Sequence, residues 1–199
     1  MRLVVATRNE HKVRELGRVL RDVELVALPD EVELPPETGA TFADNAVIKA
    51  RAAAAATGLP AVGDDSGIEA AALGGAPGVR SARYAGDDAT DEENLAKLLR
   101  QVPPDGDLRV AYACVLAFVD PAAPPGDAGL FEGRCTGILT HEPRGDAGFG
   151  YDPAFVPDDL DGDRTMAELD PAAKDAISHR GRAARAFRDW LAGEEGGAA

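Results

Sequence analysis

The sequence predicts an α/β fold in which helices flank a mixed β-sheet, and two observations lead to this prediction. In the first half of the chain, short apolar runs without alternation, typical of strands covered on both faces, alternate with helical patterns. In the middle, two longer strand candidates, residues 108–119 and 129–141, surround a proline-rich loop. This order is typical of a mixed sheet, and the length of 199 residues fits one domain covering residues 1–199.

Local signals place the individual elements along the chain. Thr41 with Asp44 forms a capping box that starts a helix, and Gly58 ends it. Asp170 and Pro171 are an N-cap and a first helical residue that open the last helical region. We therefore expect strands at residues 3–6, at 24–28, and from 61 to a turn at 64–67, with the strand continuing past that turn over 68–73. Helices are expected at 10–21, 42–57, 91–100 and 171–191. The last helix should be broken near Gly181 and followed by a frayed end at 194–199.

The acidic composition restricts the class of partner. The net charge is -14, from 35 acidic and 21 basic residues, and such a surface repels DNA, RNA and anionic lipid. A single nucleotide in a local basic pocket remains compatible with this charge. The sequence has no signal-peptide pattern and no apolar run of about 18 residues, so we expect a cytoplasmic protein without a membrane span. Cys114 and Cys135 are expected to be buried, reduced thiols.

Two segments combine helix geometry with basic and neutral donors. Residues 7–12 follow the first strand and open a helix, whose N-terminus favours phosphate through its free N–H groups. Thr41, Asn45 and Lys49 lie four residues apart and share one face of the next helix. Each segment also has an ordinary explanation, a capped helix with a solvated lysine in the first and a solvent-facing stripe in the second.

Asp64 and Asp65 are the strongest candidates for chemistry. Two adjacent carboxylates at the end of an apolar strand are costly to bury unless a cation or hydrogen-bond donors neutralise them. Mg²⁺ prefers one or two carboxylates together with water and phosphate oxygens, and a carboxylate can also deprotonate an attacking water. Glu37 is a further candidate ligand, although a loop glutamate is usually solvated. The alternative for the pair is an Asx-turn in a tight hairpin.

Two later segments offer contacts to a base. Phe149 beside Gly150 allows a flat ring to approach and stack, and Asp152 can accept from a ring N–H. Lys174 and His179 supply donors for carbonyl oxygens or phosphate. A core aromatic followed by a turn, and solvated basic side chains, are the alternatives.

Taken in order, these segments resemble the inosine/xanthosine triphosphate pyrophosphatase family. The matching motifs are TRNEHK at 7–12, ETGATF at 37–42, NA at 45–46, KAR at 49–51, DDSG at 64–67, LGGAPGV at 73–79, SARY at 81–84, FGYDP at 149–153, Lys174, and SHRG at 178–181. They span nearly the whole chain and are specific in combination. Pro36 departs from the acidic residue that some relatives have before Glu37, which leaves the number of metal-binding carboxylates open.

The resemblance implies an elongated mixed sheet in two lobes with an active-site cleft, a homodimer, and Mg²⁺-dependent hydrolysis of (d)ITP and XTP to monophosphate and pyrophosphate. It also assigns roles to single residues. Glu37, Asp64 and Asp65 would surround Mg²⁺, with Asp65 the general base. The implied substrate-binding residues are Thr7, Arg8, Asn9, Glu10, His11, Lys12, Lys49 and Ser66 at the phosphates, Phe149, Gly150, Tyr151 and Asp152 around the base, and Lys174, His179 and Arg180 at its 6-keto edge.

Two other functions are compatible with parts of the sequence. A Maf-type pyrophosphatase acting on other modified nucleotides shares the early Thr-x-Asn-like loop, but the SHRG segment fits it poorly. A non-catalytic nucleotide-binding protein would gain little from two carboxylates beside phosphate. The sequence therefore favours the pyrophosphatase.

Overall fold

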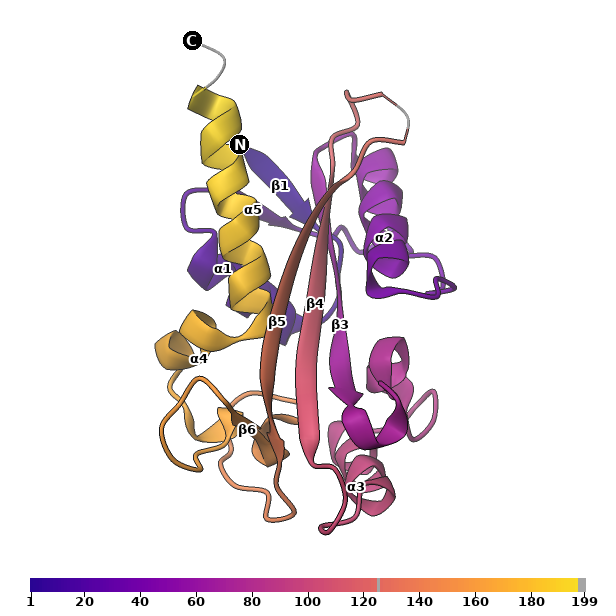
Figure 1. Ribbon diagram of the computed structural model, residues 1–199. Helices are drawn as coiled ribbons and strands as arrows, with labels where there is room; N and C mark the ends of the chain where they lie inside the picture. The colour runs from indigo at the N-terminus through magenta and orange to yellow at the C-terminus, as the bar shows by residue number, and fades with distance from the viewer. Residues whose placement is uncertain (125, 197–199) are drawn as a thin grey trace. The chain divides into compact units, whose positions relative to one another are not determined.

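The computed structural model describes residues 1–124 and 126–196 (Figure 1). The strands are β1 (Arg2–Val5), β2 (Glu24–Ala27), β3 (Ala61–Ala70), β4 (Arg109–Val119), β5 (Gly129–Leu139) and β6 (Phe155–Pro157). The α-helices are α1 (Glu10–Val19), α2 (Phe42–Thr57), α3 (Asp91–Gln101), α4 (Pro171–Ile177) and α5 (His179–Gly196), and short 3₁₀ helices are η1 (Ala71–Leu73), η2 (Gly78–Arg83), η3 (Asp152–Ala154) and η4 (Met166–Glu168). No helix in these ranges is long and apolar enough to cross a membrane.

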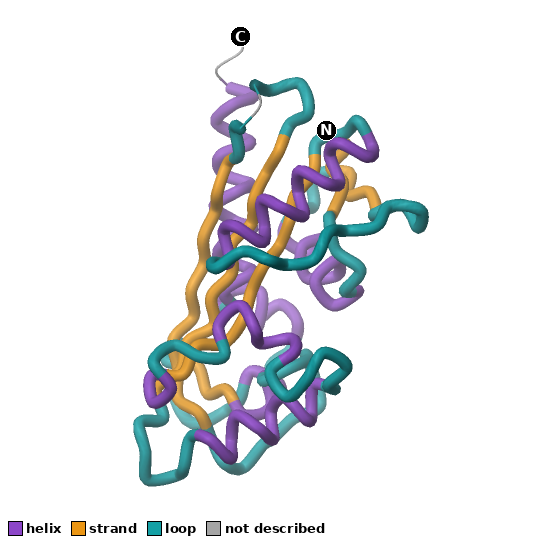
Figure 2. The backbone as a smooth tube through the Cα atoms, turned by 90° about the vertical axis from the view of Figure 1, so that its right-hand side faces the viewer, coloured by secondary structure: helices purple, strands orange, loops and turns teal. Residues whose placement is uncertain are grey.

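The strands form one mixed sheet in the order β2-β1-β3-β4-β5-β6. Strand β1 runs parallel to both β2 and β3, whereas β6 runs antiparallel to β5. Helices lie alongside the strands, as Figure 2 shows with helices in purple and strands in orange. The predicted α/β fold with a mixed sheet is confirmed.

The chain divides into two compact units. The first comprises Met1–Asp65, Cys114–Gly133 and Arg180–Ala199, and the second comprises Ser66–Ala113 and Arg134–His179. The unit boundaries fall inside β3, β4 and β5, so these strands contribute residues to both units.

The first unit has a hydrophobic core on each face of its sheet. Side chains alternate between the faces of a strand, so Val62 and Leu116 join the core that contains Leu16 and Phe187 of α1 and α5. The neighbours of these strand residues point to the other face of the sheet and pack on the alanines of α2. This second core consists of Val4, Ala6, Leu28, Ala46, Ala50, Ala53, Ala54, Ala61, Val115, Ala117 and Val119. Figure 1 shows α1 and α5 on one side of β1 and α2 on the other.

Local sequence signals explain the limits of α2. Thr41 accepts a hydrogen bond from the backbone N–H of Asp44, and the Asp44 carboxylate accepts one from the backbone N–H of Thr41. Gly58 ends the helix at a φ of 67°, a left-handed conformation that glycine adopts without a steric penalty. Residues 28–41, which precede the helix, contain no helix or strand and are drawn as loop in Figure 2.

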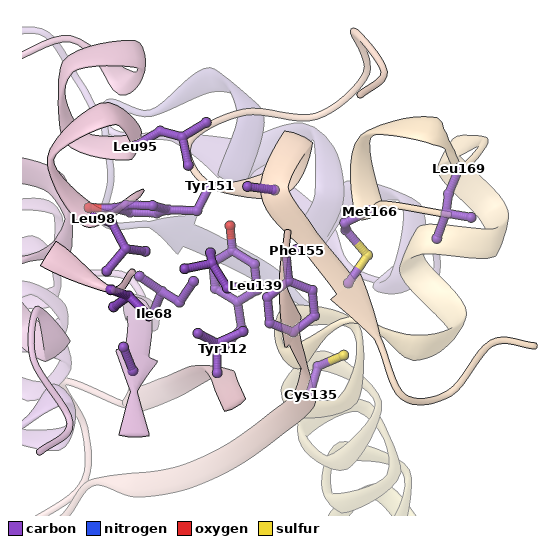
Figure 3. Close-up of a cluster of buried hydrophobic side chains, with 14 residues drawn as sticks. Ile68, Leu95, Leu98, Tyr112, Cys135, Leu139, Tyr151, Phe155, Met166 and Leu169 are labelled. Carbon is purple, nitrogen blue, oxygen red and sulfur yellow. The ribbon is translucent and has the colours of Figure 1, made fainter. Parts of the chain in front are cut away.

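The second unit surrounds a core that is richer in large side chains. Ile68, Leu98, Tyr112, Leu139 and Phe155 are buried in it, and Figure 3 shows them together with Met166 and Tyr151. The rings of Tyr112 and Phe155 lie 4.8 Å apart at a tilt of 40°. This core supports the segment that carries Phe149, Gly150, Tyr151 and Asp152, the residues expected around the base.

The prediction of a turn at residues 64–67 is wrong. Strand β3 continues without interruption from Ala61 to Ala70. Gly67, which suggested the turn, serves a close approach instead, because a Cβ at this position would lie 2.4 Å from the carbonyl oxygen of Gly78 and from Ser81 Oγ. The backbone N–H of Ile68 donates to the same Ser81 hydroxyl oxygen at 2.9 Å.

The predicted break in the last helical region is also displaced. Helix α4 ends at Ile177 and α5 begins at His179, so the interruption lies at Ser178 rather than near Gly181. The helix then continues to Gly196, and the remainder of the frayed end expected at 194–199 lies outside the described residues. The predicted loop between the two long strands is confirmed, apart from residue 125, which is not described.

Candidate active site

The candidate phosphate loop is a capped helix N-terminus in the first unit. Asn9 is the N-cap of α1, and its side-chain oxygen accepts hydrogen bonds from the backbone N–H groups of His11 and Lys12 at 2.9 and 3.2 Å. The backbone N–H of Asn9 donates to Thr7 Oγ1 at 3.1 Å. Glu10 and His11 are exposed on α1, where both contact Arg14. The capped loop therefore begins at the carboxyl end of β1, as predicted.

Arg8 holds a neighbouring loop with its guanidinium. Its Nη1 donates to the carbonyl oxygen of Leu28 at 2.8 Å, and its Nη2 donates to those of Pro29 and Val32 at 2.7 and 2.9 Å. Further hydrogen bonds reach the backbone and carboxylate of Asp30. An arginine can satisfy several acceptors at once because its fork carries five N–H donors. The structure thus places Arg8 in contact with the segment that leads toward Glu37.

Asp64 is fully buried and lies in an ion cluster on the α1–α5 face of the first unit. Lys12 Nζ donates to Asp64 Oδ1 at 2.5 Å, and Arg180 Nε donates to Asp64 Oδ2 at 2.7 Å. Arg180 Nη1 also donates to Glu15 at 2.5 Å. Burial alone would raise the pKa of Asp64, but the charges of Arg180 and Lys12 outweigh it and hold that pKa well below its ordinary value. Asp64 is therefore ionised at neutral pH, with its charge compensated by protein groups.

Arg180 differs from its expected position beside the base. It is 1% exposed, and its guanidinium binds the carboxylates of Asp64 and Glu15. The preceding residue, His179, belongs to the second unit. Because adjacent residues on a helix point about 100° apart, the sequence neighbours His179 and Arg180 enter different clusters.

Asp65 lies in a second cluster on the opposite, α2-facing side of β3. Lys49 Nζ donates to Asp65 Oδ1 at 3.0 Å and to Glu37 Oε1 at 2.6 Å, so one ammonium bridges two carboxylates. Asn45 Nδ2 donates to Asp65 Oδ2 at 3.1 Å, and Asn45 Oδ1 accepts from the backbone N–H of Gly39 at 2.8 Å. The polar stripe on α2 therefore points inward, and the solvent-facing alternative is wrong for Asn45 and Lys49, which are buried.

The electrostatics of this second cluster differ from those around Asp64. Burial raises the pKa of Asp65, Lys49 opposes the rise, and the nearby negative charge of Glu37 adds to it, leaving the pKa above its ordinary value. Burial would lower the pKa of Lys49, but Asp65 and Glu37 together raise it, so the lysine keeps its proton. A buried carboxylate with a raised pKa is better suited to accept a proton than its strongly acidic neighbour Asp64.

The carboxylates near Lys49 are the candidate ligands of a divalent cation. No group of three or more His, Cys, Asp or Glu side chains that could hold a metal occurs in residues 1–124 and 126–196. Glu37 and Asp65 are, however, close enough for one charge to raise the pKa of the other. Two hard oxygen donors of this kind would suit Mg²⁺, which proteins bind through one or two carboxylates.

The candidate base-binding residues form a cluster in the second unit. Asp152 is buried, and its Oδ2 accepts hydrogen bonds from Lys174 Nζ at 2.6 Å and from the backbone N–H of Phe149 at 3.0 Å. The Lys174 ammonium lies 5.0 Å from the centre of the Phe149 ring. Asp152 is thus tied both to the aromatic residue and to the lysine that the sequence associated with it.

Secondary contacts fix the loop that carries this cluster. The backbone N–H of Gly150 donates to Asp91 Oδ2 at 2.8 Å, and the hydroxyl of Tyr151 donates to the carbonyl oxygen of Ser81 at 2.8 Å. Tyr151 is buried, so it supports the loop from within the core. Ser66 is half-buried at the start of the second unit.

Glu15, Asp91 and Tyr112 are not among the residues that the sequence singled out, and Asn45 was expected only as part of the polar face of α2. Glu15 lies on the buried face of α1, between Val13 and Leu16. An acidic residue at a position where the helical pattern predicts an apolar one is the signal in the sequence that indicates an internal ion pair. Nothing in the local sequence relates Asp91 or Tyr112 to residues 149–152, since these contacts join segments at least 40 residues apart. The two cysteines are free and buried, as predicted.

Comparison with known proteins gives consistent results. The chain is 54% identical over 201 residues to the dITP/XTP pyrophosphatase of Frankia alni, with 95% of each chain covered, and 48% identical to that of Yersinia pestis, with 96% of this chain and 98% of the relative covered. A HAM1 protein from Coxiella burnetii has a similar structure, with a TM-score of 0.87, 43% identity and coverage of 96% and 98%.

A second solved structure carries an enzyme name. It is a nucleoside-triphosphatase or dITP/XTP pyrophosphatase from Mycobacterium abscessus, with a TM-score of 0.73, 47% identity and coverage of 94% of this chain and 97% of that one. The model of the Ham1 family matches residues 3–190, which include every candidate site residue described above. The chain therefore belongs to the Ham1 family.

Proposed function

We propose that this protein hydrolyses non-standard purine nucleoside triphosphates, dITP/ITP and dXTP/XTP, to the nucleoside monophosphate and pyrophosphate. Such hydrolysis keeps these nucleotides from being incorporated into DNA and RNA. Curated relatives with 46–54% identity over nearly the full chain bear the name dITP/XTP pyrophosphatase. The observation that carries the proposal is the pairing of Asp65 and Glu37 across the Lys49 ammonium, a buried proton acceptor beside a second carboxylate.

In the proposed mechanism, Asp65 accepts a proton from a water molecule that attacks the α-phosphorus. The bond between the α-phosphorus and the bridging oxygen breaks, and pyrophosphate leaves with that oxygen. The ammonium groups of Lys49 and Lys12 stabilise negative charge on the phosphates. Asp64 holds Lys12 and Arg180 in place without changing its own protonation.

Mg²⁺ is part of this proposal. Glu37 and Asp65 would hold the ion, which would neutralise phosphate charge and orient the attacked phosphorus. Asp64 was the third expected ligand, but its two oxygens are engaged by Lys12 and Arg180. We therefore assign Asp64 a positioning role and limit the proposed protein ligands to two carboxylates.

Selectivity for the base is assigned to the second unit. The ring of Phe149 would stack on the purine, and Lys174 and His179 would donate to the 6-keto oxygen. Adenine carries an amino donor at that position, and each buried donor left facing it costs about 1–3 kcal/mol. This mismatch would disfavour ATP by roughly 5- to 150-fold per donor, since about 1.4 kcal/mol is a factor of ten.

The proposal also covers the oligomeric state and the location of the protein. We propose a homodimer, as the family resemblance implies, and a location in the cytoplasm, where nucleotide pools are used. The acidic net charge of -14 fits a free nucleotide as partner better than a nucleic-acid polymer.

A substrate panel tests the proposed activity. Purified protein is incubated with Mg²⁺ and dITP, XTP, GTP or ATP, and the products are resolved by ion exchange. We expect pyrophosphate from dITP and XTP and little turnover of ATP. Equal turnover of ATP and dITP would contradict the selectivity, and orthophosphate with a nucleoside diphosphate would place the chain among phosphatases.

The Asp65→Asn variant tests the role of Asp65 as the general base that accepts a proton from water. Loss of a general base slows turnover by about 10²–10⁴-fold, whereas the fold should survive because asparagine can keep hydrogen bonds to Lys49 or Asn45. Asp22→Asn, the same change at an exposed position, is the matched control and should retain wild-type turnover. A fully active Asp65→Asn variant would remove Asp65 from this role.

A further inference from the structure

Tyr112 contacts two of the candidate base-reading residues at once. Its ring lies parallel to the imidazole of His179, with 4.5 Å between the ring centres and 7° between the planes. Burial and the neighbouring Asp152 carboxylate together hold the pKa of its hydroxyl well above the ordinary tyrosine value. All three side chains are buried and belong to the second unit.

The surroundings of Tyr112 fix its own position. It lies on β4, whose backbone is held within the sheet, and Phe155 packs against it at a ring distance of 4.8 Å. Figure 3 shows Tyr112 beside Phe155 and Leu139 in the buried cluster. A ring fixed by the sheet on one side and by Phe155 on another offers His179 a rigid flat surface.

His179 and Asp152 need such support for different reasons. His179 is the first residue of α5, where the chain has just left α4 through Ser178, so the helix itself gives little restriction to the ring plane. Asp152 accepts hydrogen bonds from Lys174 and from the Phe149 backbone, and its charge also acts on the buried Tyr112 hydroxyl. A parallel aromatic neighbour restricts the imidazole to one plane, which a hydrogen bond to a base edge requires.

We propose that Tyr112 is a positioning residue for base recognition, whose ring holds the imidazole of His179 and whose hydroxyl supports Asp152. This inference rests on the proposed function, because it concerns how the base of that substrate is read. The ring carries most of the effect, since Asp152 keeps these two donors when the hydroxyl is removed. Tyr112 does not touch the reacting phosphate and takes no part in the proton transfer.

Three variants separate the ring, the hydroxyl and general packing. Tyr112→Leu removes the stacked surface, and Tyr112→Phe keeps the ring but removes the hydroxyl. Phe155→Leu makes the same change of an aromatic to leucine in the same core, while leaving the Tyr112 ring on His179. Each is assayed for kcat and KM with dITP and with ATP.

We expect Tyr112→Leu to raise the KM for dITP and lower the preference for dITP over ATP by roughly three- to tenfold, the range of a lost aromatic pair, with kcat nearly unchanged. Tyr112→Phe should restore both values to near wild type, and Phe155→Leu should leave the preference intact. An unchanged preference in Tyr112→Leu would overturn the proposal. So would the same loss in Tyr112→Phe or in Phe155→Leu, since the stacked ring would then not be the cause.

A readout without substrate separates this proposal from the proposed function. Protons on an imidazole above an aromatic ring are shifted upfield in NMR spectra, and the chain has only three histidines to resolve. The signals of His179, identified by their loss in His179→Gln, should move downfield in Tyr112→Leu and stay in Tyr112→Phe. Unmoved signals would refute the stacking, whereas an inactive wild-type protein with the expected shifts would refute only the pyrophosphatase assignment.

Discussion

Asp64 and Asp65 are adjacent in sequence but have opposite acid–base properties. Successive side chains of a strand point to opposite faces, so Asp64 contacts Lys12 and Arg180 while Asp65 contacts Lys49. Two cations lower the pKa of Asp64, whereas burial and Glu37 raise that of Asp65. Paired carboxyl groups with diverging pKa values are typical of sites where one group transfers a proton and the other stays charged.

The raised pKa of Asp65 leads to a prediction for Glu37→Gln. The substitution removes a negative charge that raises the pKa of Asp65 and leaves Lys49 to act on Asp65 alone, so that pKa should fall. Carboxyl ¹³C NMR of the metal-free protein across an acid titration measures it directly. Glu33→Gln, at an exposed position of the same loop, should leave the pKa unchanged, and an unchanged or higher pKa in Glu37→Gln would contradict the electrostatic account.

The lowered pKa of Asp64 leads to a prediction for stability. Because its folded pKa is depressed, Asp64 stabilises the fold at pH values above its unfolded pKa of about 3.9, and this contribution is lost as the pH falls through the folded value. Asp64→Asn should therefore lower the free energy of unfolding by about 3–5 kcal/mol at pH 7. The deficit should shrink in acid below about pH 4.

Urea unfolding of wild type and Asp64→Asn at pH 7 and in acid measures this effect. Asp65→Asn is the control from the adjacent position. Its raised pKa means that ionised Asp65 adds no stability at neutral pH, so the variant should unfold at a similar or higher urea concentration. A deficit in Asp64→Asn that stays constant with pH would exclude the ion pairs as its cause.

At the scale of elements, strand β3 and helix α2 position Asp65, the proposed proton acceptor. The contact between them is unusually close at Gly63, where a Cβ would lie 2.1 Å from the carbonyl oxygen of Ala46 and 2.9 Å from the backbone nitrogen of Ala50. The small alanines of α2 allow this approach. It brings Lys49 and Asn45 of the helix within hydrogen-bonding distance of Asp65.

Gly63→Ala tests the close approach. The new methyl group meets backbone atoms that cannot rotate away, so we expect a loss of about 1–3 kcal/mol, typical of overpacking, and weaker turnover because α2 must shift. Gly17→Ala is the control, since its methyl group would meet only Leu25 Cδ1 at 3.9 Å in the interior of α1. That variant should gain about 0.5–1 kcal/mol. Thermal unfolding compares the two, and a neutral Gly63→Ala would disprove the tight contact.

At the scale of the whole molecule, charge and assembly are the properties to consider. The cations of the two ion clusters do not offset the acidic charge of the protein, because Lys12, Lys49 and Arg180 are each paired with carboxylates of the described structure. The protein is therefore strongly acidic as a whole, with a net charge of -14, while each of these cations lies within an ion cluster.

The proposed homodimer is a prediction at this scale. Light scattering coupled to size-exclusion chromatography should give twice the chain mass of 20.7 kDa. Leu130 and Trp190 are large apolar side chains left 46% and 36% exposed in the first unit, as expected of a surface with a partner. A mass of one chain across micromolar concentrations would contradict the dimer.

Local sequence signals determined the secondary structure and the residue types of the site. The limits of α2 follow from Thr41 and Gly58, and the start of α3 follows from its N-cap Thr90, because caps act within one helical turn. The mixed sheet followed from the order of apolar runs. Motifs spread over the chain also identified Lys12, Lys49, Asp65, Asp152 and Lys174, which the structure joins into charged clusters within their units.

Only the tertiary structure decided which of these residues share a cluster. Strand β3 runs through residues 64–67 without a turn, so its alternation sends Asp64 and Asp65 to opposite faces. Likewise, the direction of side chains on α5 places Arg180 in contact with Asp64 and His179 in contact with Tyr112. Side-chain direction depends on the register and packing of whole elements, which a pattern of residue types along one chain does not contain.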